Sequence, residues 1–148
     1  MLQFLDEIDS NLIKKSNELE DIFSLKVGRI LVDVLSKEEF KKFGLRDWAV
    51  AFANPQKKCI TIIKQGESGR DINEWRKVLI HEMVHIFYLH KFKTDKPVWF
   101  FEGLACFLAD QKKKGTVVSI KELIDHFSEC NEKTYALGYN AVKNCLES

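Results

Sequence analysis

The chain has 148 residues, the size of one domain, and is long enough to bury about two-thirds of the surface that its unfolded form exposes. Its 45% hydrophobic and 30% charged residues are typical of a soluble globular protein. A formal net charge of +1 gives no reason to expect a nucleic acid or an anionic membrane as a partner. We therefore expect a single domain, residues 1–148, with an ordinary apolar core.

The N-terminus and the cysteines bear on the cellular compartment. Residues 1–7 are acidic and lack the basic leader and apolar core of a signal peptide, and no apolar run approaches the length that spans a bilayer. Because the cysteines show no Cys-x-x-Cys spacing, we expect buried, reduced thiols at Cys59, Cys106, Cys130 and Cys145. These features predict a cytoplasmic protein that does not attach to membranes.

The sequence of the N-terminal part predicts one helix, followed by three strands and one short helix. Residues 2–23 carry an apolar stripe at helical spacing, and residues 28–35 are rich in β-branched residues, as in a strand. Ser36 and Glu39 form a capping box that opens a short helix ending near Gly44. Residues 48–53 and 59–63, separated by the turn residues 54–57, predict a β-hairpin. The stripe comprises Leu5, Ile8, Leu12, Leu19 and Ile22.

A longer helix follows and carries the central motif. Asp71 and Glu74 form a capping box at its start, and its apolar periodicity continues to about residue 92. Inside it lies a His-Glu-x-x-His pattern, residues 81–85. Residues four apart share one face of a helix, so His81 and His85 can direct two imidazole nitrogens to one zinc ion. Glu82 can then reach a water on that ion and act as a general base.

A catalytic zinc ion requires a third protein ligand and an open position, and Glu102 is the candidate ligand. It lies in a second helix that starts near Pro97, and residues 93–97 can span up to roughly 16 Å, enough to fold this helix back. Gly103 and Ala105 would let the two helices approach closely. The alternatives are an exposed first-turn glutamate, and a pair of core histidines bonded to backbone carbonyls.

The remaining segments predict helices. Lys112–Lys114 with Gly115 indicate the basic last turn and glycine cap of the second helix. Ser119 opens a helix to about residue 127, and residues 134–146 form the last one. His90 lies on the opposite side of its helix from His81 and is not a ligand. His126 is expected to be a surface or packing residue, with a site role as the alternative.

The fold class is α+β: a small N-terminal mixed sheet with the active helix, and a helical C-terminal subdomain.

The two central segments resemble the gluzincin metallopeptidases, whose zinc ligands are two histidines and a glutamate. The stretch from Trp99 to Ala105 is similar to the Trp-x-x-Glu-Gly-Phe-Ala stretch of the membrane alanyl aminopeptidase type. The resemblance implies a zincin-like fold, zinc as the cofactor, the ligands His81, His85 and Glu102, and Glu82 as the general base. Residues 135–139 are similar to the family's Tyr-x-x-Gly stretch, which implies that Tyr135 stabilises the oxyanion, with Tyr139 as a competitor.

The chain also departs from these relatives. It lacks a Gly-x-Met-Glu-Asn exopeptidase signature, so aminopeptidase activity is not expected. Cys106 stands where thermolysin-like enzymes place a carboxylate that orients a histidine, and Asp110 is a possible substitute. A thiolate ligand at Cys106 is the alternative to Glu102. The short chain is similar to the minimal gluzincins, sometimes called minigluzincins.

The resemblance implies a zinc-dependent endopeptidase that acts on proteins or peptides. The substrate would pair with one strand of the predicted hairpin, and a purely structural hairpin is the alternative. Two rival hypotheses are an inactive zinc-binding relative that serves as a binding or structural module, and a latent enzyme whose own terminus or second copy fills the cleft. We expect a monomer or weak self-association.

Overall fold

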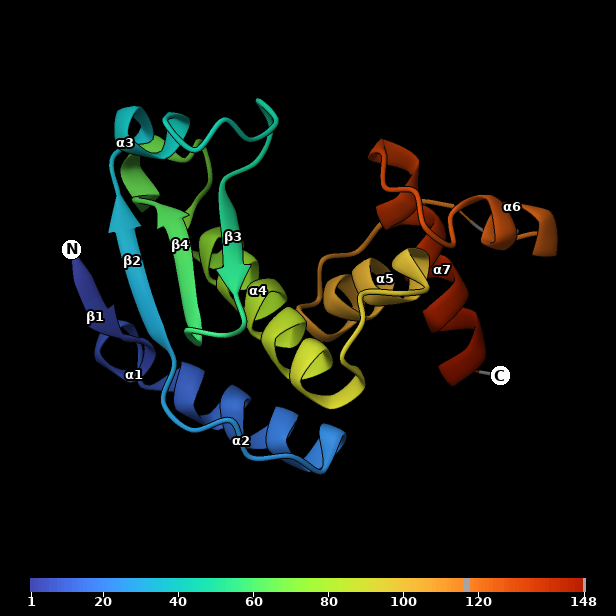
Figure 1. Ribbon diagram of the computed structural model, residues 1–148, viewed down its shortest axis with the longest axis horizontal. Coiled ribbons are helices and arrows are strands. Elements are labelled where there is room, and N and C mark those ends of the chain that lie inside the picture. Colours follow the sequence, from blue (N-terminus) through green and yellow to red (C-terminus); the bar gives the residue numbers. More distant parts are fainter. Residues whose placement is uncertain (116–117, 148) are drawn as a thin grey trace.

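The computed structural model describes residues 1–115 and 118–147 and combines a small sheet with helices (Figure 1). Its elements are β1 (Leu2–Phe4), α1 (Leu5–Ile8), α2 (Asn11–Phe23), β2 (Leu31–Leu35), α3 (Lys37–Lys41), β3 (Ala51–Asn54), β4 (Cys59–Ile63), the 3-10 turn η1 (Gln65–Glu67), α4 (Ile72–Phe92), α5 (Val98–Leu108), α6 (Ile120–Asp125) and α7 (Glu132–Glu147). The expected mixture of helices and strands is confirmed. We call residues 1–92 the N-terminal half and the described residues from 98 onward the C-terminal half.

The sheet has four strands in the order β1-β2-β4-β3 and is mixed, as expected. β2 and β4 are parallel, whereas β1 and β3 pair antiparallel with their neighbours. The predicted hairpin is confirmed as β3 and β4. β4 is an interior strand, so only β3 of this pair has a free edge. In Figure 1, α4 lies between the sheet and the pair α5 and α7.

The N-terminal segment differs from the single helix predicted over residues 2–23. Its first residues form β1, since Leu2 pairs with Asp33 and Phe4 with Leu31, a long-range pairing that local periodicity cannot reveal. The rest divides into α1 and α2. Ile22 is 55% exposed, so it does not belong to the buried stripe, and Phe23 is buried instead.

Three other expectations are corrected. β2 starts at Leu31 rather than at residue 28, because Gly28 has a φ of 86°, which is not a strand conformation. α5 ends at Leu108, so Lys112–Lys114 follow the helix instead of forming its last turn. Asp110, with a φ of 56°, turns the chain away before the lysines. Of the four cysteines expected to be buried, only Cys106 is; Cys59 and Cys130 are half-buried and Cys145 is exposed.

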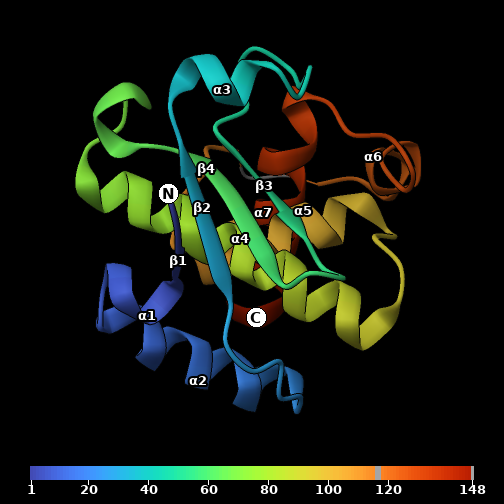
Figure 2. The ribbon, with the colours of Figure 1, turned by 60° about the vertical axis from the view of Figure 1, so that its left-hand side comes forward.

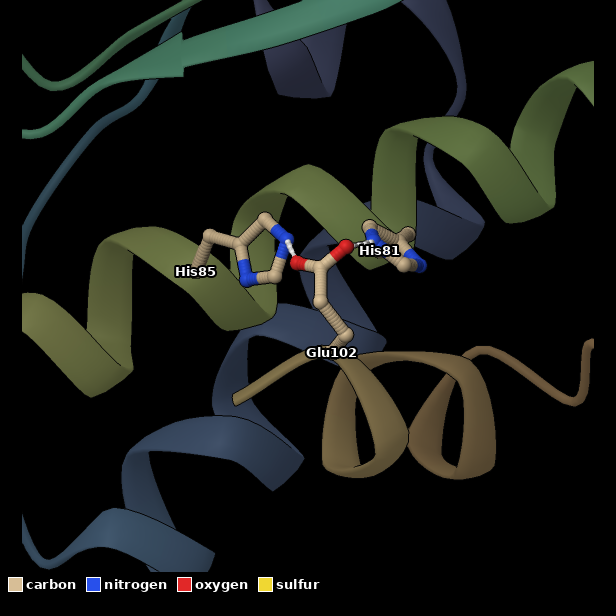
Figure 3. Close-up of side chains that lie close together, drawn as sticks. All are labelled: His81, His85 and Glu102. Atoms are coloured by element: carbon tan, nitrogen blue, oxygen red, sulfur yellow. Dashed lines mark ion pairs between the residues drawn. The ribbon is translucent and has the colours of Figure 1, made fainter. Parts of the chain in front are cut away.

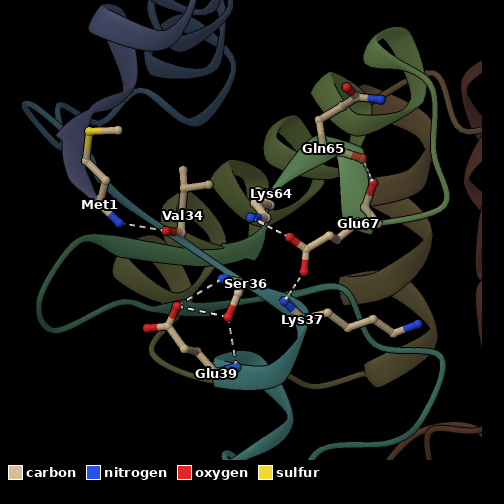
Figure 4. A network of polar contacts seen from close by, with 9 residues as sticks. Met1, Val34, Ser36, Lys37, Glu39, Lys64, Gln65 and Glu67 are labelled. Atoms are coloured by element: carbon tan, nitrogen blue, oxygen red, sulfur yellow. Dashed lines mark hydrogen bonds and ion pairs between the residues drawn. The ribbon is translucent and has the colours of Figure 1, made fainter.

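Side-chain caps begin two of the helices as the sequence predicts. The Ser36 hydroxyl accepts from the Glu39 amide, and the Glu39 carboxylate accepts from the Ser36 amide at 3.3 Å (Figure 4). The Glu67 carboxylate accepts from the Lys37 amide and pairs with Lys64, which ties the start of α3 to the segment after β4. At the start of α4, Asp71 accepts from the Glu74 amide at 2.8 Å, but the Glu74 carboxylate pairs with Lys77, so only half of the predicted capping box forms.

The main core lies between the sheet, α2 and α4; in Figure 2, α4 passes behind the sheet and α2 lies below it. Apolar residues from all three elements meet there, among them the fully buried Leu19, Ile60, Leu79 and Phe87. Because one face of α4 packs into this core, the orientation of its opposite face is determined as well. Among the described helices, none has the length and apolar content that crossing a bilayer requires.

Candidate metal centre

His81 and His85 lie one turn apart on the face of α4 that is turned toward α5 (Figure 3). Both side chains are buried. The Nε2 atom of His85 is 2.6 Å from one oxygen of Glu102, and the Nε2 atom of His81 is 3.8 Å from the other. The same nitrogen of each imidazole is therefore directed at one carboxylate, and the alternative in which both rings bond to backbone carbonyls does not describe this site.

Glu102 comes from α5 and is only 6% exposed, which rules out the exposed first-turn glutamate. One ligand atom from each of His81, His85 and Glu102 lies within 4.8 Å of the other two. Two imidazole nitrogens and a carboxylate oxygen at this spacing can hold a metal ion. The expected cluster of three donors is thus formed by residues from two helices.

Gln111 orients His81, although no motif in the sequence points to this residue. Its Oε1 atom is 2.7 Å from His81 Nδ1. Because a carbonyl oxygen only accepts, Nδ1 carries a proton in this contact, and Nε2 is the nitrogen that can bind a metal ion. The exposed Asp110, considered for this role from the sequence, is the neighbour that turns the chain so that Gln111 reaches the ring.

Cys106 is buried at the back of the same imidazole. Its Sγ atom is 3.8 Å from His81 Nδ1, the ring nitrogen that does not face Glu102. A sulfur in this position contacts the ring nitrogen that Gln111 already holds. Cys106 therefore supports the orientation of His81, and the group of donors that can hold a metal contains Glu102 rather than this thiol.

Packing holds His85. Its ring stacks on Phe101 with centroids 3.8 Å apart and an interplanar angle of 12°. Its Nδ1 atom is buried and has no hydrogen-bond partner in the described part of the chain. The two histidines are therefore held in different ways, one by a hydrogen bond and the other by an aromatic ring of the helix that carries Glu102.

A glycine contact joins α5 to α7, which differs from the predicted role of Gly103 in bringing α5 against α4. A Cβ atom added to Gly103 would lie 2.1 Å from the carbonyl carbon of Gly138, and one added to Gly138 would lie 1.9 Å from the carbonyl oxygen of Trp99. Only glycine allows this approach of two backbones. Ala105 does belong to the core that α4 helps to form, as predicted.

This contact brings Tyr135 of α7 to the cluster. Its ring centroid is 6.2 Å from that of His81, and its hydroxyl interacts with the Glu102 carboxylate and the Cys130 thiol. Tyr139 instead packs with its ring 6.2 Å from that of Phe107. Of the two tyrosines left open by the sequence, Tyr135 is the one at the site.

The carboxylates and the tyrosine have shifted pKa values. Burial raises the pKa of the Tyr135 hydroxyl, and the nearby Glu102 charge raises it further, so this hydroxyl keeps its proton. Burial also raises the pKa of Glu82, although the two histidines oppose this shift. Burial acts in the same direction on Glu102, but the contacts with His85 and His81 outweigh it and hold its pKa well below the usual range. Glu102 is therefore charged, as a metal ligand must be.

A cavity of about 750 Å³ opens onto the three donors. One wall is β3 with the segment before it, a second is the face of α4 that carries the two histidines, and the third belongs to the C-terminal half. Glu82, which is half-buried, and Tyr135 both line this cavity. The structure thus places the two predicted catalytic residues and the three predicted ligands around one space.

The other two histidines have structural contacts. His90 Nε2 is 2.8 Å from the carbonyl oxygen of Pro55, which ties the end of α4 to the β3–β4 turn. His126 Nδ1 is 2.8 Å from the Thr134 hydroxyl, which links the end of α6 to α7. Neither belongs to the group of donors that can hold a metal.

Comparisons with known proteins add no relative to this description. No family model matches the chain, and no curated protein and no solved structure matches it significantly. The function of the chain is therefore inferred from its own residues.

Proposed function

We propose that this chain is a zinc-dependent metallopeptidase of the minimal gluzincin type, with a zincin-like fold, that hydrolyses internal peptide bonds of proteins or peptides. One observation carries the proposal. A buried His81, His85 and Glu102 cluster faces a cavity that Glu82 and Tyr135 also line.

Zinc suits this donor set better than the hard cations do. Two imidazoles and one carboxylate, with a cavity beside them, correspond to three protein ligands and an open position, the pattern of catalytic zinc sites. Because Gln111 accepts the Nδ1 proton of His81, Nε2 is the nitrogen directed at the metal position, and a metal ion bound there would replace the proton that Nε2 carries in the metal-free protein. A zinc ion bound here would supply a Lewis acid that acidifies a water and polarises the substrate carbonyl.

Glu82 serves as the general base in this proposal. It accepts a proton from the attacking water and delivers it to the amine of the leaving product. Because burial raises its pKa, the protonated form is easier to reach than for an exposed glutamate. Its position on α4 beside His81 keeps its carboxylate at the cavity.

Tyr135 serves as a hydrogen-bond donor to the carbonyl oxygen of the scissile bond as negative charge develops there. A protonated hydroxyl is required for this role, and burial together with the Glu102 charge keeps it protonated. The substrate backbone would pair with the free edge of β3, since β3 is an edge strand and lines the cavity.

Metal content and casein cleavage, measured together, test the proposal. Wild type is expected to hold one zinc ion per chain and to cut casein, whereas Glu82→Gln should retain the zinc and lose at least about a hundredfold in rate. His90→Gln is the control, because His90 lies on the same helix but bonds to Pro55 away from the donors.

Three outcomes would contradict the proposal in whole or in part. Carefully purified protein without metal would mean that His81, His85 and Glu102 form only a buried ion-pair cluster. One zinc ion without cleavage in wild type would favour the inactive binding module or the latent enzyme, and removal of terminal segments would then separate these two. Cleavage by Glu82→Gln at the wild-type rate would exclude Glu82 as the base.

A further inference from the structure

The two ends of the cavity differ in charge, and the contacts of β3 define which end is which. His90, at the end of α4, contacts the Pro55 carbonyl just after β3, so the last residues of β3 lie near the C-terminal end of α4. At the other end, the Ile63 amide at the end of β4 donates to Val50 just before β3. The segment that joins β4 to α4 and includes Arg70 begins at the end of β4, and therefore beside the start of β3.

Two arginines line the cavity at the end where β3 begins. Arg46 lies in the segment before β3, and Arg70 lies directly before α4. Arg46 donates to the Cys130 carbonyl at 3.0 Å and its guanidinium carbon lies 5.6 Å from the centre of the Trp48 ring. These contacts hold its planar group at the junction of the two halves and leave other N–H groups to bind a ligand.

The ion pairs of the chain distinguish these arginines from the others. The sequence has four arginines, of which Arg29 pairs with Asp6 and Arg76 pairs with Asp9. Within the described residues, neither Arg46 nor Arg70 has a carboxylate at ion-pair distance. Thus the chain pairs the arginines outside the cavity and leaves the two cavity arginines without an anion.

The remaining charges of the wall support a difference between the ends. Asp95, which follows α4, lines the cavity at the end where β3 stops. Lys113 and the exposed Glu132, one of each sign, also line the cavity. A bound carboxylate is therefore favoured near Arg46 and Arg70 and disfavoured near Asp95.

The direction of β3 converts this charge difference into a substrate preference. Strand pairs are more often antiparallel than parallel, and an antiparallel peptide on β3 has its C-terminal residues where β3 begins. Resting on the proposed peptidase function, we propose that Arg46 and Arg70 select substrates with a carboxylate a few residues to the C-terminal side of the scissile bond. An Asp or Glu side chain or the free C-terminus of a short peptide can supply this carboxylate, since both match the fork of an arginine.

The test compares matched peptides. A peptide bond that wild type cleaves in casein is placed in decapeptides with Glu or Gln two residues to its C-terminal side, or with Glu two residues to its N-terminal side. Each decapeptide is made with an amidated end, and a truncated Gln peptide is made with both a free and an amidated C-terminus. The ratio of kcat/KM for Glu over Gln is measured in wild type, Arg46→Gln, Arg70→Gln and the double variant.

We expect wild type to prefer the C-terminal-side Glu by about threefold to tenfold, the range of a partly exposed arginine–carboxylate contact. The ratio should fall toward one in the double variant. Arg29→Gln is the control and should keep the wild-type ratio, because Arg29 is paired with Asp6 outside the cavity. A ratio taken within each variant cancels any general loss of activity. The truncated pair shows whether a side chain or a chain end is the natural source.

Three results would overturn the proposal: no preference for either carboxylate, a preference for Glu on the N-terminal side, or an unchanged ratio in the double variant. If casein is not cleaved at all, the proposed function fails separately. Fluorescence anisotropy with labelled Glu and Gln decapeptides based on a casein sequence then decides the binding question. Tighter binding of the Glu peptide to wild type than to the double variant supports the arginine site, and equal binding overturns it.

Discussion

The N-terminal and C-terminal halves contribute to the same site but are stabilised in different ways. The N-terminal half buries large apolar side chains such as Leu79 and Phe87 between the sheet, α2 and α4. The C-terminal half relies on close contact of small residues at Gly103 and Gly138, while Ile120 and Ile124 of α6 are 77% and 68% exposed. The two histidines thus belong to the better packed half, and Glu102 and Tyr135 to the other. A metal ion held by all three donors would connect the halves.

The largest expected effect is in the N-terminal half. Phe87 is fully buried and its ring stacks near Phe23 with centroids 5.8 Å apart. Phe87→Ala should reduce the free energy of unfolding by about 3–5 kcal/mol, measured by urea denaturation. Phe92→Ala, five residues on but 51% exposed, is the control and should change it by less than about 1 kcal/mol. Equal losses would mean that the core described for α4 does not carry the stability.

A second prediction concerns the C-terminal half. Gly138→Ala places a Cβ atom 1.9 Å from the Trp99 carbonyl oxygen, so α5 and α7 must separate. We expect a loss of about 2–3 kcal/mol in unfolding free energy and weaker zinc binding, because Glu102 moves with α5 while the histidines stay. Gly66→Ala is the control, since nothing lies within 4 Å of its added Cβ. Unchanged zinc affinity in folded Gly138→Ala would show that the two helices do not position the ligand.

A third prediction concerns the residue that links the segment after α5 to His81. Gln111→Leu removes the acceptor for Nδ1 and should weaken zinc binding by about 10–100-fold, measured by competition with a chelator. Lys112→Gln, a neighbouring exposed change, should leave the affinity unchanged. If Gln111→Leu binds zinc as tightly as wild type, the contact with Cys106 rather than with Gln111 orients His81.

The smallest effect is a pH dependence of the metal-free protein, since no contact is removed. Burial lowers the pKa of His81, but its contacts with Cys106 and Glu102 outweigh burial and raise the pKa well above the ordinary value of 6.5. The folded state then binds a proton that the unfolded state releases. This stabilisation is fully present below pH 6.5 and is lost as the pH rises through the raised pKa.

Chelator-treated protein should therefore unfold at a lower urea concentration at about pH 9 than at about pH 6. In His81→Asn this decrease should be absent. Zinc-loaded protein should show the opposite trend, because protons compete with the metal for the histidines. If the metal-free protein becomes more stable from pH 6 to pH 9, the raised pKa of His81 is contradicted.

Much of the candidate site follows from local sequence rules, because the spacing of His81 and His85 on a helix fixes their common face. Glu102 followed from the length of the connection, which limits where α5 can lie. The role of Gln111 could not be predicted from the sequence, because its position depends on the turn at Asp110, where no helical period applies. The position of Arg46 could not be predicted either, because its contact with Cys130 joins residues far apart in the chain.

The fold shows the same division. The capping residues and the hairpin are local features, and the structure has them where the sequence predicts them. β1 was mistaken for part of a helix because its strand conformation depends on pairing with β2, about thirty residues away. Gly103 was assigned to the wrong neighbouring helix, because a helical period shows that a small residue allows close approach but does not show which partner approaches.

The contact of Gly103 with Gly138 also has a mechanical consequence. Because the backbones of α5 and α7 touch, the two helices must move together as one rigid body. Residues 93–97, which connect α4 to α5, would be the hinge for a swing of this body. Such a swing would carry Glu102 and Tyr135 away from His81 and His85 in a single step. The third ligand and the hydroxyl donor would then engage together or not at all, so a half-assembled centre would have no catalytic competence.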